Sequence, residues 1–155
     1  MANLIESQGD VAQLSGTEKI KRASRGLYGT IAEELGQPTD HFSDDNVQLL
    51  KHHGSYQQDN RDTRLSRKKQ GLDRDYRLMV RTKFPGGRIS AEQYLLCDDL
   101  CVKYGQGDLR ATSRQDFQFH GVLKGSLRPL IHDLNTLGEI MTFGGCGDVV
   151  RNTMA

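Results

Sequence analysis

The sequence predicts an α+β fold in which helices cover one face of a small sheet. Three observations predict this class: strict strand alternation at residues 76–84, helical apolar spacing after a capping sequence at residue 90, and two short strand-forming runs within residues 108–122. A chain of 155 residues has room for one packed domain plus an extension. Since only 35% of its residues are hydrophobic, we expect some of the chain to be exposed or covered by something outside this sequence.

Charge and cysteine content argue against several functional classes. The 21 basic and 20 acidic residues nearly cancel, which argues against a general nucleic-acid or membrane-binding role, so any anion site must be local. The three cysteines are few and odd in number, and residues 1–10 do not resemble a signal or transit peptide. We therefore expect a cytoplasmic protein without a membrane span.

Residues 15–35 are predicted to form one amphipathic helix. Ser15 and Glu18 make a capping-box pattern, and Gly36 with Pro38 ends the periodic segment. The apolar residues that recur at helical spacing are Ile20, Ala23, Leu27, Ile31 and Leu35.

Residues 39–75 are polar and rich in charge, and neither a helical nor a strand period fits them. The simplest interpretation is a solvated linker, which we predict for residues 61–69 (R-D-T-R-L-S-R-K-K). The hydrogen-bonding side chains of residues 54–58 (G-S-Y-Q-Q) also suit an arm lying across a partner surface or a cofactor pocket, so both interpretations stay open there. Residues 1–75 are thus predicted to hold a helix and an extended arm.

Residues 76–84 alternate between a mainly apolar face and a second, cationic face that includes Arg81. This pattern predicts a strand. After a Pro-Gly-Gly turn, Ser90 with Gln93 offers a second capping box, and the helix that it opens ends near Gly105.

Two short strands are predicted at residues 108–113 and 116–122, followed by a helix capped by Ser126 and a brief strand at residues 140–143. The order along residues 76–143 is therefore strand, helix, strand, strand, helix, strand. This is a ferredoxin-like β-α-β-β-α-β half-domain with its helices on one face of the sheet. The other face is left free.

Residues 108–121 concentrate cationic and hydrogen-bonding groups among strand-forming apolar residues. These groups belong to Arg110, Arg114, Gln118 and His120. Two arginines, an amide and an imidazole indicate a polyanionic ligand, although an ordinary surface hairpin can also carry two arginines. If the strand register is right, Arg81 and Arg110 both point from the free face, where a large planar anion has room to lie.

Four motifs, taken together and in this order, resemble the amino-terminal part of the haemoprotein in the sirohaem-dependent sulfite and nitrite reductase family. They are H-G-S-Y-Q-Q-D-N-R-D at residues 53–62, R-T-K-F-P-G-G at 81–87, R-A-T-S-R-Q-D-F-Q-F-H-G at 110–121 and C-G-D-V-V-R-N at 146–152. In the family the first motif belongs to an extended arm. It favours the sulfite reductases over the nitrite reductases.

The resemblance implies six-electron reduction of sulfite to sulfide at a sirohaem iron coupled to a 4Fe-4S cluster. By motif match, Arg81 and Arg151 would be the catalytic residues that bind the sulfite anion. The residues that would contact the sirohaem are Arg110, Thr112, Arg114, Gln118, His120 and Asn152. Residues 76–143 would be the half-domain, and residues 144–155 the start of the sirohaem and iron-sulfur domain.

The family's cluster ligands are four cysteines in a C-x5-C and a C-x3-C pair, far along a longer chain, and this sequence lacks them. Cys97 and Cys101 have C-x3-C spacing but lie inside a predicted helix, so we expect buried thiols there. The resemblance thus implies a truncated chain that is inactive without the remainder of its own chain. The electron donor would be ferredoxin or an NADPH-dependent flavoprotein subunit.

Two alternatives stay open. One is a nitrite reductase that uses the same cofactors. The other is a short non-enzymatic protein that binds a tetrapyrrole or a partner through the free face of the sheet.

Overall fold

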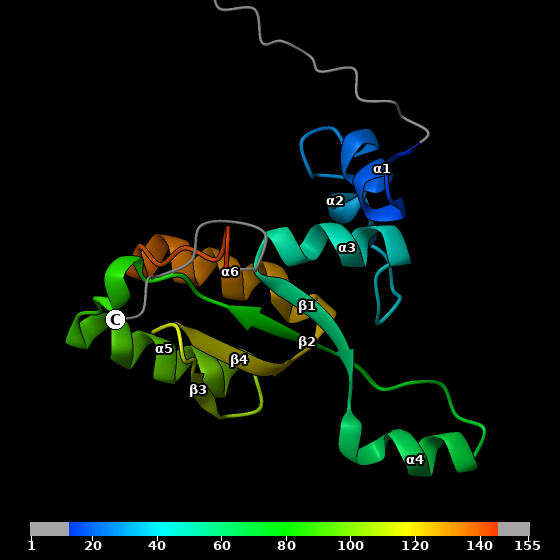
Figure 1. Ribbon diagram of the computed structural model, residues 1–155. Coiled ribbons are helices and arrows are strands. Elements are labelled where there is room, and N and C mark those ends of the chain that lie inside the picture. The colour runs from blue at the N-terminus through cyan, green and yellow to red at the C-terminus, as the bar shows by residue number, and fades with distance from the viewer. Residues whose placement is uncertain (1–12, 146–155) are drawn as a thin grey trace, which may run out of the picture.

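The computed structural model describes residues 13–145. At its centre is a four-stranded antiparallel sheet with the order β1-β2-β4-β3 (Figure 1). The strands are β1 (Ser55–Asp59), β2 (Tyr76–Arg81), β3 (Leu109–Ala111) and β4 (Phe117–Val122). The predicted α+β class and the ferredoxin-like arrangement are confirmed.

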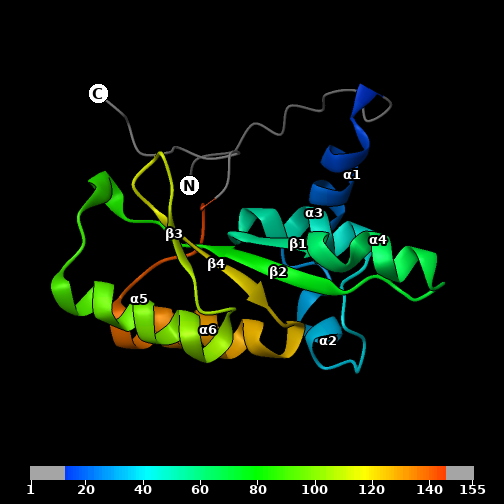
Figure 2. The same ribbon diagram turned by 90° about the horizontal axis from the view of Figure 1, so that it is seen from below.

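Two long helices, α5 (Ala91–Tyr104) and α6 (Lys124–Gly138), lie side by side on one face of this sheet (Figure 2). The predicted capping box opens α5, because the Ser90 hydroxyl accepts a hydrogen bond from the Gln93 backbone N–H at 3.1 Å. Val80 and Phe119, which face each other across β2 and β4, are fully buried in the core beneath the helices.

The start of α6 differs from the prediction. The backbone N–H of Ser126 donates to the Leu123 carbonyl at 2.9 Å, so the first turn has already formed and the helix begins at Lys124. The Ser126 hydroxyl therefore does not cap it. Lys124 is 5% exposed, and its Nζ donates to the Thr39 hydroxyl at 2.6 Å, which connects the start of α6 to the segment around residue 39.

The strand beside β2 is β1, and the prediction of a last strand at residues 140–143 is wrong. The residue pairs run from Ser55 opposite Val80 to Asp59 opposite Tyr76. Strand β1 therefore occupies the edge of β2 at which the predicted last strand would have paired. Only Met141 reaches beyond it, in an isolated bridge with Lys83. Residues 39–75, in which neither a helical nor a strand period was found, thus supply an edge strand of the sheet.

The single helix predicted over residues 15–35 is two helices, α1 (Gly16–Ala23) and α2 (Ile31–Leu35). Between them the backbone takes positive φ at four of the five residues from 25 to 29, namely Arg25, Gly26, Leu27 and Gly29. A Cβ at Gly29 would lie 2.5 Å from both the Asn46 and Leu49 side chains, so the chain turns where it packs against the next helix. Tertiary packing here outweighs helical periodicity.

The polar segment that follows is also helical, which corrects the linker prediction for residues 61–69. It holds α3 (Asp44–His52) and α4 (Arg61–Lys69). Both helices have acidic residues in the first turn and basic residues in the last turn, which complements the helix dipole. Figure 1 shows α4 projecting from the end of the sheet, and none of its residues is buried.

A short 3-10 turn, Pro85–Gly87, joins β2 to α5. None of the helices within residues 13–145 is long and apolar enough to cross a membrane. The division of the chain at residues 75 and 143 stays a prediction, although the sheet itself includes β1 from before the first boundary.

Candidate anion and cofactor site

Three polar residues form a cross-strand row on the sheet face opposite α5 and α6. Arg81 on β2 pairs with Gln118 on β4, and Gln118 in turn pairs with Arg110 on β3. Residues that pair directly point to the same face, and the neighbouring Val80 and Phe119 point into the core. The fold therefore brings Arg81 and Arg110 to one face, with an amide between them.

Gln118 connects Arg81 to His120. With its amide oxygen turned toward Arg81, Gln118 accepts hydrogen bonds from Nη2 at 2.8 Å and from Nε at 3.3 Å. Its amide nitrogen then donates to Nε2 of His120 at 3.1 Å. This orientation satisfies both neighbours, and it requires an Nε2 that carries no proton.

His120 stands at a bulge in the sheet. Between two ladder pairs, β4 has one residue more than β2, and Gly121 next to the histidine takes a φ of +71°. Burial lowers the pKa of His120, and the positive charges of Arg110 and Arg81 lower it further, while Asp108 opposes them. The neutral imidazole is thereby favoured, in agreement with the hydrogen bond that it accepts.

Asp108 holds the outer arginine of the row. Nε of Arg110 donates to Oδ2 of Asp108 at 2.8 Å, while the Arg110 side chain stays 55% exposed. Burial acts to raise the pKa of Asp108, but hydrogen bonds from Arg110 and Gln106 outweigh it and leave the pKa below its ordinary value. The carboxylate therefore stays ionised, and an incoming anion would compete with it for Arg110.

Thr112 and Arg114 lie in the turn between β3 and β4. The Thr112 hydroxyl accepts hydrogen bonds from the backbone N–H groups of Arg114 at 3.3 Å and Asp116 at 3.1 Å, so it closes this turn. The Arg114 side chain is exposed. The remaining candidates, Arg151 and Asn152, lie outside the described residues.

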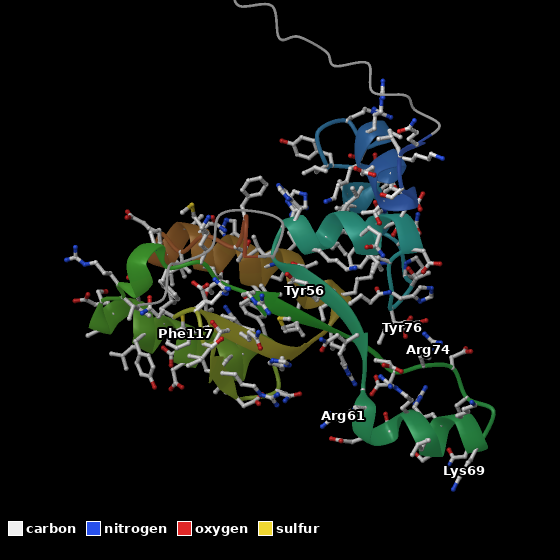
Figure 3. The ribbon with its side chains drawn as sticks, in the orientation of Figure 1. Tyr56, Arg61, Lys69, Arg74, Tyr76 and Phe117 are labelled. Atoms are coloured by element: carbon white, nitrogen blue, oxygen red, sulfur yellow. The ribbon has the colours of Figure 1, made fainter. Side chains whose placement is uncertain are left out.

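Tyr56 and Met79 also belong to this face, although neither is among the predicted site residues. They pair across β1 and β2, and the centre of the Tyr56 ring lies 5.3 Å from Cζ of Arg81. Figure 3 shows Tyr56 on β1. The sequence signal for Tyr56 is its place in the G-S-Y-Q-Q segment, and the signal for Met79 is its position two residues before Arg81 on an alternating strand.

A polar groove of about 900 Å³ opens beside the row, at the end of the sheet where α5 finishes. Arg110 and His120 line it. The other cationic residues in its wall are Arg61, Arg64, Arg77 and Lys103. Arg64, Arg77, Lys103 and Arg110 each form an ion pair with an aspartate, so most of this charge is already balanced. The groove is therefore polar, with both basic and acidic side chains in its wall.

Cys97 and Cys101 are buried free thiols on α5. Burial raises the pKa of Cys97 to about 12, and Sγ of Cys101 donates to the Asp98 carbonyl at 3.0 Å. Thiols in this state are protonated, whereas metal and cluster ligands are thiolates. Within residues 13–145, no group of three or more His, Cys, Asp or Glu side chains could hold a metal ion.

Comparison with known proteins identifies the domain that carries this row. Residues 70–137 match the family described as the nitrite/sulfite reductase ferredoxin-like half domain. The chain is 45% identical over 144 residues to the ferredoxin sulfite reductase of Synechococcus elongatus, with 92% of the chain covered. It is 46% identical over 143 residues to the NADPH sulfite reductase hemoprotein beta-component of Acidithiobacillus ferrooxidans, with the same share covered.

The chain spans only about a quarter of these relatives, 22% of the first and 25% of the second. A solved structure with the same fold is the NirA protein of Mycobacterium tuberculosis, with a TM-score of 0.69 and 19% sequence identity over 87% of this chain and 26% of that one. Residues 70–137 therefore belong to the nitrite/sulfite reductase ferredoxin-like half domain family, and the chain is similar to sulfite reductases over about nine-tenths of its length.

Proposed function

We propose that the chain supplies one wall of the sirohaem and sulfite pocket of an assimilatory sulfite reductase. The observation that carries this proposal is the row of Arg81, Gln118 and Arg110 on the free face of the matching half domain. Guanidinium groups stay charged and bind carboxylate or sulfite oxygens through pairs of N–H bonds. A planar cofactor with many carboxylates needs such a surface.

The described residues fit this cofactor. Arg110 and His120 line the groove beside the sheet, while the partly exposed Tyr56 ring adds apolar surface to the same face. Sirohaem, when bound, supplies the iron at which sulfite is reduced. The residues that would hold its polar groups are Arg110, Thr112, Arg114, Gln118, His120 and Asn152.

Arg81 and Arg151 would bind the sulfite anion. The Arg81 guanidinium is fixed on one side by Gln118, which orients the rest of its N–H groups for an anion. Such preoriented donors stabilise negative charge that builds up during the reduction.

The described residues do not fit a 4Fe-4S cluster, because Cys97 and Cys101 are buried, protonated thiols. The cluster ligands would lie in the remainder of the protein, and the chain would be inactive without it. Residues 144–155 would begin the sirohaem and iron-sulfur domain. Two relatives are named for ferredoxin and for NADPH, so the donor here would be ferredoxin or an NADPH-dependent flavoprotein subunit, in the cytoplasm.

The coding sequence beyond Ala155 tests the proposal directly. We expect an in-frame continuation that contains a C-x5-C and a C-x3-C pair. A genuine stop codon with no such region nearby would contradict the reductase assignment. Turnover of the completed protein on sulfite and on nitrite, compared side by side, then decides between the two reductase activities, and we expect sulfite to be preferred.

Replacing Arg81 tests its role in the completed protein. We expect Arg81→Ala to weaken sulfite binding roughly tenfold to a hundredfold, because a charge-assisted bond is lost, with the sirohaem retained. Spectral titration with sulfite measures the affinity, and the absorbance of the purified protein reports the haem. Loss of sirohaem with unchanged sulfite affinity would contradict the assigned role.

A further inference from the structure

The backbone around Tyr56 is fixed on both sides. Gly54 has a φ of +77°, and a Cβ there would lie 2.2 Å from the Thr142 carbonyl oxygen and 2.8 Å from that of Arg81. The Gly54 carbonyl accepts a hydrogen bond from the Arg81 N–H at 2.8 Å. Ser55 is fully buried opposite Val80. Tyr56, the next residue, therefore has a defined position on the free face of the sheet.

The ring of Tyr56 lies diagonally across from Arg81. Tyr56 pairs directly with Met79, and Arg81 is two residues further along β2 on the same face. Diagonal neighbours on one face are within reach of aromatic and long side chains. The distance of 5.3 Å from Cζ of Arg81 to the ring centre is that of a cation–π contact.

The guanidinium of Arg81 is thus held by two groups of different kinds. Gln118 accepts from Nη2 and Nε, which fixes the direction of the side chain, and the aromatic ring fixes the position of the guanidinium above β1. An arginine has five N–H donors, so two bonds to Gln118 leave the Nη1 side for another acceptor.

The Tyr56 hydroxyl makes a second connection. It donates to the Gly145 carbonyl oxygen at 3.5 Å, a long contact that links β1 to the chain after α6. A Cβ at Gly145 would lie 2.9 Å from the Arg81 carbonyl oxygen, so this turn also packs directly on β2. The Tyr56 side chain therefore contacts both Arg81 and the turn at Gly145 that packs on β2.

We propose that Tyr56 is a positioning residue that holds the Arg81 guanidinium, through its ring, in the orientation needed to bind an anion. The ring is the essential part, and the hydroxyl contributes to the packing of the turn. What Arg81 binds rests on the proposed function, but the contact between Tyr56 and Arg81 does not. This assigns a role to the segment that the sequence left open between linker and arm.

NMR of the 155-residue chain tests the contact itself. We expect the Arg81 side-chain protons to show an upfield ring-current shift and cross-relaxation with the Tyr56 ring. Both signals should persist in Tyr56→Phe and disappear in Tyr56→Leu. A wild-type chain without the shift, or a folded Tyr56→Leu with the shift unchanged, would overturn the proposal. If Tyr56→Leu does not fold, wild type and Tyr56→Phe still decide, because both must show the shift.

Titration of the completed protein with sulfite measures the consequence. We expect Tyr56→Phe to match the wild type and Tyr56→Leu to bind roughly tenfold more weakly, since the cation–π contact that orients Arg81 is lost. Equal affinity of wild type and Tyr56→Leu would contradict a positioning role. If the wild type binds no sulfite while the ring-current shift is present, the proposed function fails for this chain and the Tyr56–Arg81 contact stands, so the two failures are distinguishable.

Discussion

Arg81, Gln118 and His120 form a chain of contacts in which each side chain sets the state of the next. The amide of Gln118 has one oxygen and one nitrogen, so accepting from Arg81 commits it to donating to His120. The imidazole must then stay neutral, and burial together with Arg110 and Arg81 lowers its pKa in the same direction. The protonation state of His120 is therefore coupled to the position of the arginine.

This coupling predicts how stability depends on pH. The unfolded chain protonates His120 near the ordinary pKa of about 6.5, whereas the folded chain protonates it only at lower pH. The contribution of His120 to the free energy of unfolding is therefore complete above the pKa of the unfolded chain. It is lost as the pH falls through the lower pKa of the folded chain.

In the wild type we expect the free energy of unfolding to fall as the pH is lowered from roughly 7.5 to 5.5, and we expect this fall to be smaller in His120→Gln. Urea denaturation of both proteins across this range measures it. A His120 variant with the wild-type slope would show that this imidazole titrates normally.

Cys97 is predicted to be chemically inert in the folded chain. It is fully buried, and its pKa is raised to about 12, so almost no thiolate exists near neutral pH. We expect iodoacetamide to leave Cys97 unmodified in the native protein and to modify it in urea, as measured by peptide mass spectrometry. Rapid modification of the native protein would show an accessible, activated thiol.

At the level of elements, the edge of the sheet depends on the turn before β1. Gly54 must adopt a left-handed backbone while the Thr142 and Arg81 carbonyls pack against its α-carbon. We expect Gly54→Ala to cost about 3 kcal/mol or more of unfolding free energy, from strain and overpacking together.

Gly71→Ala is the matched control for this substitution. Gly71 also has a positive φ, of +67°, but nothing lies within 4 Å of an added Cβ. We therefore expect only the backbone strain, about 1 kcal/mol. Urea unfolding of the two variants compares them, and equal losses would mean that the close approach at Gly54 is not what fixes β1.

The sequence predicts best the elements whose signals are local. The Ser90 and Gln93 capping box and the strand β2 are both found in the structure, although Met79 on the predicted cationic face of β2 is buried. Apolar periodicity does not reveal helices α3 and α4, because both are short and rich in charged residues. Their sequence signal is the acidic residues in the first turn and the basic residues in the last turn. The pairing of β1 with β2 depends on a contact between distant segments, which no local pattern encodes.

For the whole molecule, the decisive feature is that the two faces of the sheet differ. Helices α5 and α6 cover one face (Figure 2). The pairing of the strands places Arg81, Gln118 and Arg110 on the other face. The sequence places both arginines on this face by alternation alone. It does not reveal that Asp108 already holds Arg110, because that contact depends on how the turn before β3 folds.

Sirohaem titration into the cofactor-free form of the completed protein, followed by absorbance, tests the central claim that this face binds the cofactor. We predict saturable binding that Arg110→Gln weakens roughly tenfold to a hundredfold, since a bond between charged groups is lost. Arg128→Gln, which removes the same charge from an exposed position on α6, should bind like the wild type. Absence of a saturable change, or equal weakening by both variants, would contradict the account.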